Sequence, residues 1–159
     1  MAKRQNRNDL VKRRMQFNDT VIHDFFANRS EVVLAYLFGS YITRNTGSYH
    51  DIDIAVFVDP DRLDGLDRET PYGYRACLSS ELAHILKFDL VDVVFLNHAP
   101  PLLSRRVIGS GKLIFCRSDS DRVRFEVLSL KRYADTAHIR RIKRLYMKHR
   151  IEKGLMAYA

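Results

Sequence analysis

Two apolar segments separated by a short polar loop constrain the fold of this chain more than any other feature. Residues 32–40 read Val-Val-Leu-Ala-Tyr-Leu-Phe-Gly-Ser, and residues 51–58 read Asp-Ile-Asp-Ile-Ala-Val-Phe-Val. Both segments are rich in the β-branched and aromatic residues that favour strands, and the loop between them holds Asn45, Thr46 and Gly47, which favour turns. The pattern predicts a strand, a tight turn with a short helix, and a second strand.

The second predicted strand begins with two acidic residues, Asp51 and Asp53. Side chains alternate between the two faces of a strand, so both carboxylates are expected on the same face. Like charges this close raise each other's pKa unless a cation lies between them. Mg²⁺ prefers such hard oxygen ligands and uses them together with substrate phosphates. We therefore predict a magnesium site here; the alternative is a pair of strand-end acids that cap a turn.

Residues suited to a phosphate group lie at the end of the first predicted strand. Gly39 lets the backbone approach a ligand, and Ser40 opens the short helix, whose free N–H groups would bind an anion. Arg44 lies one turn further on, where it either reaches a phosphate or is an exposed loop residue. His50 is interpreted as a turn residue, with a metal ligand or acid–base group as the alternative.

A third acid lies on a later apolar run, residues 91–96, which reads Val-Asp-Val-Val-Phe-Leu. Asp92 shares its face with Val94 and Leu96, whereas Asp89 lies outside the run, so the strand itself presents only Asp92. Beside the other two acids, Asp92 would complete a two-metal site or accept the proton of an attacking hydroxyl. The sequence leaves open whether the two strands are neighbours.

The rest of the chain alternates helical and strand patterns. Apolar residues at three- and four-residue intervals predict helices over residues 8–27, 72–87 and 119–145, the last of them divided near residues 135–136. Asn97 is the expected cap of a further helix. Residues 112–116 read as a last strand at a sheet edge, and residues 59–67 read as a polar loop. The order of elements predicts an α/β or α+β domain with a short mixed sheet.

Composition narrows the class of protein. The 159 residues suffice for one domain with a real core, and the apolar fraction of 46% is ordinary for a globular protein. No apolar run approaches the roughly 20 residues of a membrane helix. The basic N-terminus lacks the apolar run of a secretory signal, so a cytoplasmic location is expected. Cys77 and Cys116 have no metal-binding spacing, and we expect both to be reduced and structural.

The net charge of +8 is concentrated at the two ends. Residues 1–14 carry six basic residues against one acid, and residues 131–159 carry nine against two, which leaves a net charge of −4 between them. Basic ends on an acidic centre suggest that phosphate or an acidic partner is met at the termini while a metal is held in the middle. The alternative is that both ends are simply solvated.

The residues of the predicted site resemble a known family. The stretch from Leu37-Phe-Gly-Ser-Tyr41 through Asp51-Ile-Asp-Ile-Ala-Val56 is similar to the signature of the DNA polymerase beta-like nucleotidyltransferase superfamily. More narrowly, the short chain and residues 91–103 resemble the minimal nucleotidyltransferases, the MNT partners of HEPN/MNT toxin–antitoxin modules. The resemblance covers about residues 18–146. It implies one nucleotidyltransferase domain over residues 1–159, with a basic extension over 1–14 and a basic helical segment over 119–153.

The resemblance also implies an activity. Members of the family transfer a nucleoside monophosphate from a nucleotide, usually ATP, to a hydroxyl; in the antitoxin branch the acceptor is a tyrosine of the cognate HEPN ribonuclease. By position, Gly39 and Ser40 would contact the triphosphate, and Asp51 and Asp53 would hold Mg²⁺ with Asp92 as the third acid. One departure is His50, where the family commonly has Ser.

Other functions are weighed against this one. A small-molecule acceptor would require a further substrate domain, for which this chain has no room. A binding module could neutralise its partner by occlusion, but all three acids are present. Nucleic-acid binding through the basic termini is possible and is not favoured. On the leading hypothesis, the basic C-terminal helix is a docking surface for an acidic partner.

Overall fold

The computed structural model of the chain describes residues 19–43 and 51–156. Its elements are, in chain order, α2 (Asp19–Ala27), β1 (Val32–Phe38), α3 (Ser40–Thr43), β2 (Ile52–Val58), α4 (Pro60–Glu69), α5 (Tyr74–Leu86), β3 (Val91–Phe95), α6 (Pro101–Ser110), β4 (Lys112–Cys116), α7 (Asp119–Asp135) and α8 (Ala137–Met156). The basic extension over residues 1–14, the first half of the predicted helix 8–27, Arg44 and His50 lie outside the described residues.

The four strands form one mixed sheet in the order β3-β2-β1-β4. β1 is antiparallel to both of its neighbours, and β2 is parallel to β3. The predicted strands, the mixed sheet and the edge position of β4 are therefore confirmed. One consequence matters for the site: β1 ends at the same end of the sheet at which β2, β3 and β4 begin.

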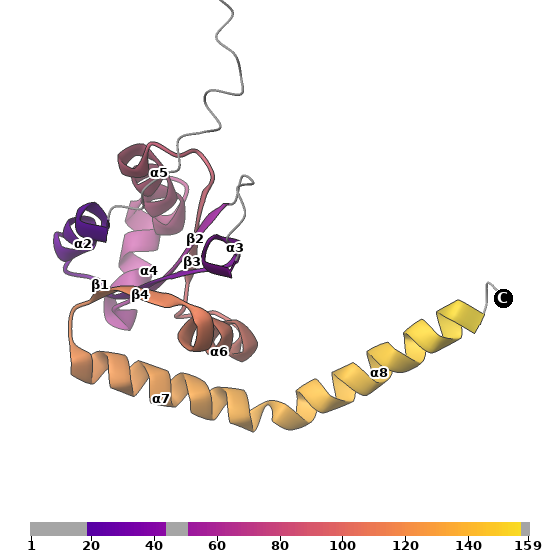
Figure 1. Ribbon diagram of the computed structural model, residues 1–159. Helices are drawn as coiled ribbons and strands as arrows, with labels where there is room; N and C mark the ends of the chain where they lie inside the picture. The colour runs from indigo at the N-terminus through magenta and orange to yellow at the C-terminus, as the bar shows by residue number, and fades with distance from the viewer. Residues whose placement is uncertain (1–18, 44–50, 157–159) are drawn as a thin grey trace, which may run out of the picture.

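Helices cover both faces of the sheet (Figure 1). On one face, α2, α4 and α5 bury residues such as Phe26, Leu63 and Leu78 against the strands. On the other face, Val107 of α6 and Phe125 of α7 pack on the sheet. Apolar side chains on both faces of the strands supply these two cores, which is why β1 and β2 read as nearly continuous apolar runs.

Arg117, the residue after β4, joins this strand to α2 and to the start of β1. The Arg117 guanidinium donates hydrogen bonds to the carbonyl oxygens of Val32 (2.8 Å), Phe26 (3.1 Å) and Arg29 (2.7 Å). These carbonyls lie at the end of α2, in the following turn and at the start of β1, where a cation is favoured by the helix dipole. Arg117 therefore closes the domain at the end of the sheet opposite to the start of β2.

The prediction of a polar loop over residues 59–67 is wrong, because this segment forms most of α4. The Asp59 carboxylate accepts the backbone N–H two residues further on at 3.0 Å and caps the helix, and Pro60 occupies the first turn. Leu63 is the one residue of this helix that is buried. A helix with so narrow an apolar face lacks the periodic pattern on which the sequence prediction depended.

The prediction that Asn97 caps the next helix is also wrong. Its side chain instead accepts the Val58 backbone N–H at 3.1 Å and donates to the Val58 carbonyl at 2.7 Å, so it continues the pairing with β2 beyond the end of β3. The cap of α6 is Pro100, and Gly111 ends the helix. The misassignment arises because the partner of Asn97 is distant in sequence.

The predicted division of the last helix is confirmed at Thr136, which separates α7 from α8. α7 packs on the sheet, whereas α8 projects away from the body of the molecule (Figure 1). No helix in the described part of the chain is both long enough and apolar enough to cross a membrane. Cys77 and Cys116 are both free thiols.

Candidate active site

The three predicted acids lie at one end of the sheet. Asp53 in β2 pairs with Asp92 in β3 and, on its other side, with Phe38, the last residue of β1. Asp51 immediately precedes β2. The sequence left open whether these two strands are neighbours. They are, and their pairing brings two acids that lie 39 residues apart in the chain into direct cross-strand register. Parallel pairing also places the two side chains on the same face of the sheet.

Gly39 is held against Asp53. It has a φ of +78°, a conformation that side chains with a Cβ rarely adopt, and an added Cβ would lie 1.9 Å from Asp53 Oδ2. Glycine is required here by both the backbone conformation and the space. The sequence predicted that this glycine allows a close approach to a ligand; its close neighbour is the carboxylate itself. Ser40 then begins the short helix α3, as predicted.

The electrostatics of the site follow from this grouping. Asp51 and Asp92 are exposed, whereas Asp53 is partly buried. Burial raises the pKa of Asp53 above its ordinary value, and the negative charges of Asp92 and Asp51 raise it further. The three carboxylates therefore repel one another, and a bound cation would relieve the repulsion.

The site fits Mg²⁺ in a limited sense. Within residues 19–43 and 51–156, no three His, Cys, Asp or Glu side chains are grouped so that they could hold a metal ion by themselves. Magnesium, however, is usually held by one or two carboxylates and completes its octahedral shell with water and substrate phosphates. Asp53 and its acidic neighbours Asp51 and Asp92 offer oxygen donors and negative charge for such binding, and a bound cation would favour the charged form of Asp53.

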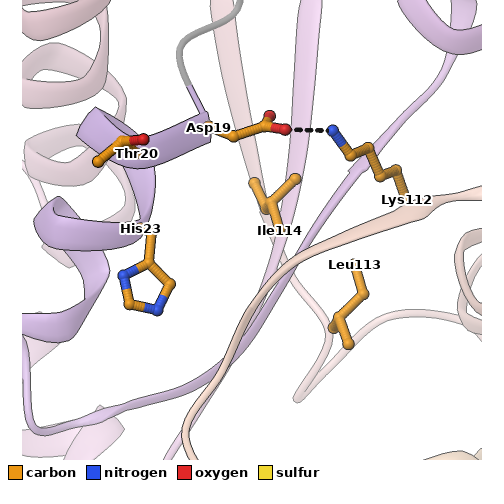
Figure 2. A pocket seen from close by; sticks show the side chains of 6 residues that line it. All are labelled: Asp19, Thr20, His23, Lys112, Leu113 and Ile114. Carbon is orange, nitrogen blue, oxygen red and sulfur yellow. Dashed lines mark hydrogen bonds and ion pairs between the residues drawn. The ribbon is translucent and has the colours of Figure 1, made fainter.

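A separate surface hollow of about 390 Å³ lies between α2 and β4 (Figure 2). It is lined by Asp19, Thr20, His23, Lys112, Leu113 and Ile114. Lys112 Nζ contacts Asp19 Oδ2 at 2.6 Å across it, and the His23 ring packs edge-on against Phe115. None of the predicted site residues borders this hollow, so the acids at the sheet end form a different site.

Sequence reasoning missed one group of exposed apolar residues. Val123, Val127 and Leu130 belong to the helical pattern over residues 119–145, yet all three are exposed on α7. Phe125, between them in sequence, is the residue that packs on the sheet. The signal in the sequence is a second apolar stripe, at positions i, i+4 and i+7, on a helix that already has a buried face.

Comparison with known proteins shows to which family this chain belongs. Residues 20–120 match the family model described as polymerase beta, nucleotidyltransferase. The match spans the sheet and includes Asp51, Asp53 and Asp92, so the fold is that of a nucleotidyltransferase domain. This chain belongs to the polymerase beta-type nucleotidyltransferase family. Solved structures similar to this chain include toxin–antitoxin complexes of MntA with HepT and of an MNT antitoxin with a HEPN toxin.

Three of these structures are informative. A toxin–antitoxin structure with AMP-PNP contains a chain 31% identical to this one, with a TM-score of 0.64, over 82% of this chain and 98% of that chain. An MntA–HepT toxin–antitoxin structure gives 29% identity and a TM-score of 0.58, over 81% and 95%. The MNT antitoxin in complex with a tri-AMPylated HEPN toxin of Shewanella oneidensis gives 28% and 0.59, over 84% and 98%. No curated protein matches the sequence significantly.

Proposed function

We infer that this protein is an adenylyltransferase that moves AMP from ATP to a tyrosine hydroxyl of a HEPN toxin and thereby acts as its antitoxin. The observation that carries the inference is the register of Asp53 with Asp92, with Asp51 just before β2, in a chain of the nucleotidyltransferase family. The tri-AMPylated HEPN toxin of one similar structure supports the acceptor, and the AMP-PNP of another supports the nucleotide.

Each site residue has a proposed role. Asp51 and Asp53 would hold Mg²⁺, which when bound neutralises negative charge on the phosphates. Gly39 and Ser40 would contact the triphosphate. Asp92 would accept the proton of the tyrosine hydroxyl as its oxygen bonds to the α-phosphorus and pyrophosphate leaves. The exposure of Asp92 at the edge strand β3 leaves it accessible to a hydroxyl from another protein.

The test is transfer of label from α-³²P-ATP, with MgCl₂, to the HEPN-type protein encoded by the neighbouring gene. Asp53→Asn and Asp92→Asn should each lower the rate by about a hundredfold or more, because each removes a group that acts in the transfer step. Asp89→Asn is the matched control: it is exposed, lies three residues from Asp92 outside the strand, and should keep the wild-type rate.

A different result would replace the proposal. If the wild-type protein transfers no label yet suppresses the toxicity of its partner as well as the Asp53→Asn variant does, neutralisation is by occlusion. If label appears on RNA and not on the protein, the acceptor is a nucleic acid.

A further inference from the structure

α8 is exposed along nearly its whole length. It joins the body through α7, and Figure 1 shows it extending away from the sheet on the side where α3 lies. All residues from 141 to 154 are exposed. Most helices in proteins are stabilised by packing an apolar face rather than by intrinsic propensity, so a 20-residue helix without such packing suggests a missing neighbour.

The exposed surface of α8 is unusually apolar. Its large apolar side chains are 52–67% exposed: Ile139, Ile142, Leu145, Tyr146, Met147 and Ile151. Ile139, Ile142 and Tyr146 follow the three- and four-residue spacing that places side chains on one face of a helix. Contiguous apolar surface of this kind on a folded protein marks an interaction site.

The same helix is strongly basic. It carries one acid, Glu152, against seven basic residues: Arg140, Arg141, Lys143, Arg144, Lys148, Arg150 and Lys153. Lys143 and Arg150 each lie four residues beyond a member of the Ile139–Tyr146 stripe, so these two cations border the stripe on the helix surface. A protein partner that covers the apolar stripe and pairs with these cations must itself present acidic side chains around an apolar surface.

The direction of α8 is fixed at its joint with α7. The Arg140 guanidinium lies 3.6 Å from the centre of the Tyr133 ring and donates a hydrogen bond to Thr136 Oγ1. Thr136 Oγ1 in turn donates to the carbonyl oxygen of Arg132 or Tyr133, at 3.0 and 3.1 Å. A helix held in this way is presented to a partner already oriented, which lowers the entropic cost of binding.

We propose that α8 is a docking helix for an acidic protein, in which the Ile139–Tyr146 stripe enters an apolar groove rimmed by Asp and Glu side chains. The proposal rests on the proposed function in one respect: the docked protein is the one whose tyrosine accepts AMP. α8 supplies affinity for this acceptor and takes no part in the transfer step.

Other occupants fit less well. Nucleic-acid phosphates would pair with the basic side chains but would leave the Ile139–Tyr146 stripe in water. A second α8 would bring seven more basic residues against the first seven, and like charges in contact disfavour binding. A membrane surface would suit the cations, but the Ile139–Tyr146 stripe runs on into His149 and Lys153 at the same spacing, so little apolar surface is available for insertion.

The test uses two variants of the full chain, Lys143→Glu/Arg150→Glu and Ile142→Ser/Tyr146→Ser. Arg75→Glu/Lys87→Glu on and beside α5 is the control, because it changes the net charge equally on exposed residues. Binding of the neighbouring gene's HEPN-type protein is measured by calorimetry without ATP, and label transfer is measured over a range of acceptor concentrations. Circular dichroism confirms that each variant is folded.

Both α8 variants should raise the Kd and the KM for the acceptor about tenfold or more, with kcat unchanged at saturating acceptor. The control should behave as wild type. An unchanged Kd in both folded α8 variants overturns the docking inference, and label transfer that still depends on Asp53 then leaves the proposed function intact. Conversely, a raised Kd in a protein that transfers no label supports docking and contradicts catalysis.

Two further measurements test the competing occupants. Binding of a labelled 30-nucleotide RNA that is lost in Lys143→Glu/Arg150→Glu, while the HEPN-type protein binds unchanged, would show that α8 recognises nucleic acid and overturn the proposal. Sedimentation of the protein alone should show no self-association through α8. A dimer that dissociates in Ile142→Ser/Tyr146→Ser, with unchanged partner binding, would likewise overturn it.

Discussion

Asp53 occupies the most constrained position of the site. It is flanked in the sheet by Phe38 and Asp92, and its carboxylate fills the space where a side chain at residue 39 would lie. The same contacts that fix its position remove part of its hydration. A charged carboxylate in this environment destabilises the fold unless a cation is bound beside it. Asp53 therefore links the stability of the fold to cation binding at the site.

This link gives a pH-dependent prediction. The pKa of Asp53 is raised in the folded protein, so its contribution to stability is fully present below the unfolded-state pKa of about 3.9 and is lost as the pH rises through the folded-state pKa. In metal-free buffer, Asp53→Asn should therefore be more stable than wild type at pH 7, with the difference shrinking towards pH 4. Urea denaturation with EDTA at both values measures it.

Two additions make this measurement decisive. Asp89→Asn, an exposed acid beside the strand, should change the stability at neither pH. MgCl₂ with a non-hydrolysable ATP analogue should stabilise the wild type more than Asp53→Asn, since ligands stabilise the state that binds them. Equal stability of wild type and Asp53→Asn at pH 7 would mean that the charged Asp53 carboxylate does not destabilise the metal-free fold.

At the scale of elements, α7 is attached to the inner strand β1 by a partly buried polar contact. The Tyr36 hydroxyl on β1 donates a hydrogen bond to Glu126 Oε1 at 3.0 Å. Arg122 Nη1 donates to the same carboxylate oxygen at 3.2 Å, while its Nε donates to Asp119 Oδ1 at 2.9 Å. Because α8 continues from α7, this network determines from which point on the domain α8 projects.

Replacing Tyr36 by Phe tests the attachment. Tyr36→Phe removes the hydroxyl but keeps the buried ring, and Glu126 retains its pairing with Arg122, so the free energy of unfolding should fall by about 1 kcal/mol. Tyr72→Phe is the control, because the Tyr72 side chain is 98% exposed and its loss of a hydroxyl should cost nothing. Equal denaturation midpoints for the two variants would show that the Tyr36–Glu126 contact contributes no net stability.

The elements that could be predicted from the sequence are those whose signal is local. The alternation of acids and apolar residues around Asp53 and Asp92 predicted two strands that each present a carboxylate, and the structure contains them. The Ser40 helix start and the division at Thr136 are equally local, since a turn or a cap is specified by adjacent residues.

The features that could not be predicted depend on distant partners. That β3 lies beside β2 follows from the packing of α5, and no pattern within residues 91–96 expresses it. Asn97 resembles a helix cap until Val58 is beside it. The contact of Gly39 with Asp53 likewise appears only when β1 and β2 are paired. α4 was missed for a different reason, because only Leu63 and the partly buried Leu66 supply its core contacts, too few for a periodic pattern.

At the scale of the whole molecule, the fold divides into a packed domain and the exposed helix α8. Ending the chain after Thr136 removes α8 without uncovering the two cores, whose buried residues all lie between Ile22 and Phe125. The thermal midpoint should therefore change by less than about 4 °C, the shift that roughly 1 kcal/mol would produce in a domain of this size. Differential scanning calorimetry measures the shift.

A core variant sets the scale for that result. Leu82 on α5 is fully buried, and Leu82→Ala should cost about 2–5 kcal/mol and lower the midpoint far more than the truncation does. A truncated protein that unfolds as readily as Leu82→Ala would mean that α8 is part of the folded domain's stability and is more than an appended surface.

The strand order has a further consequence, for synthesis on the ribosome. β1 pairs with β2 soon after both emerge, but its other edge is filled only by β4, and Arg117 closes over the start of β1 later still. Phe38 and Lys112 are separated by about 75 residues, which take roughly 4–15 s to translate. For that time the central strand exposes an unpaired apolar edge, the kind of edge that pairs with other chains. A nascent chain that stalls before β4 is thus an aggregation-prone intermediate, and completion of residues 112–117 ends that exposure.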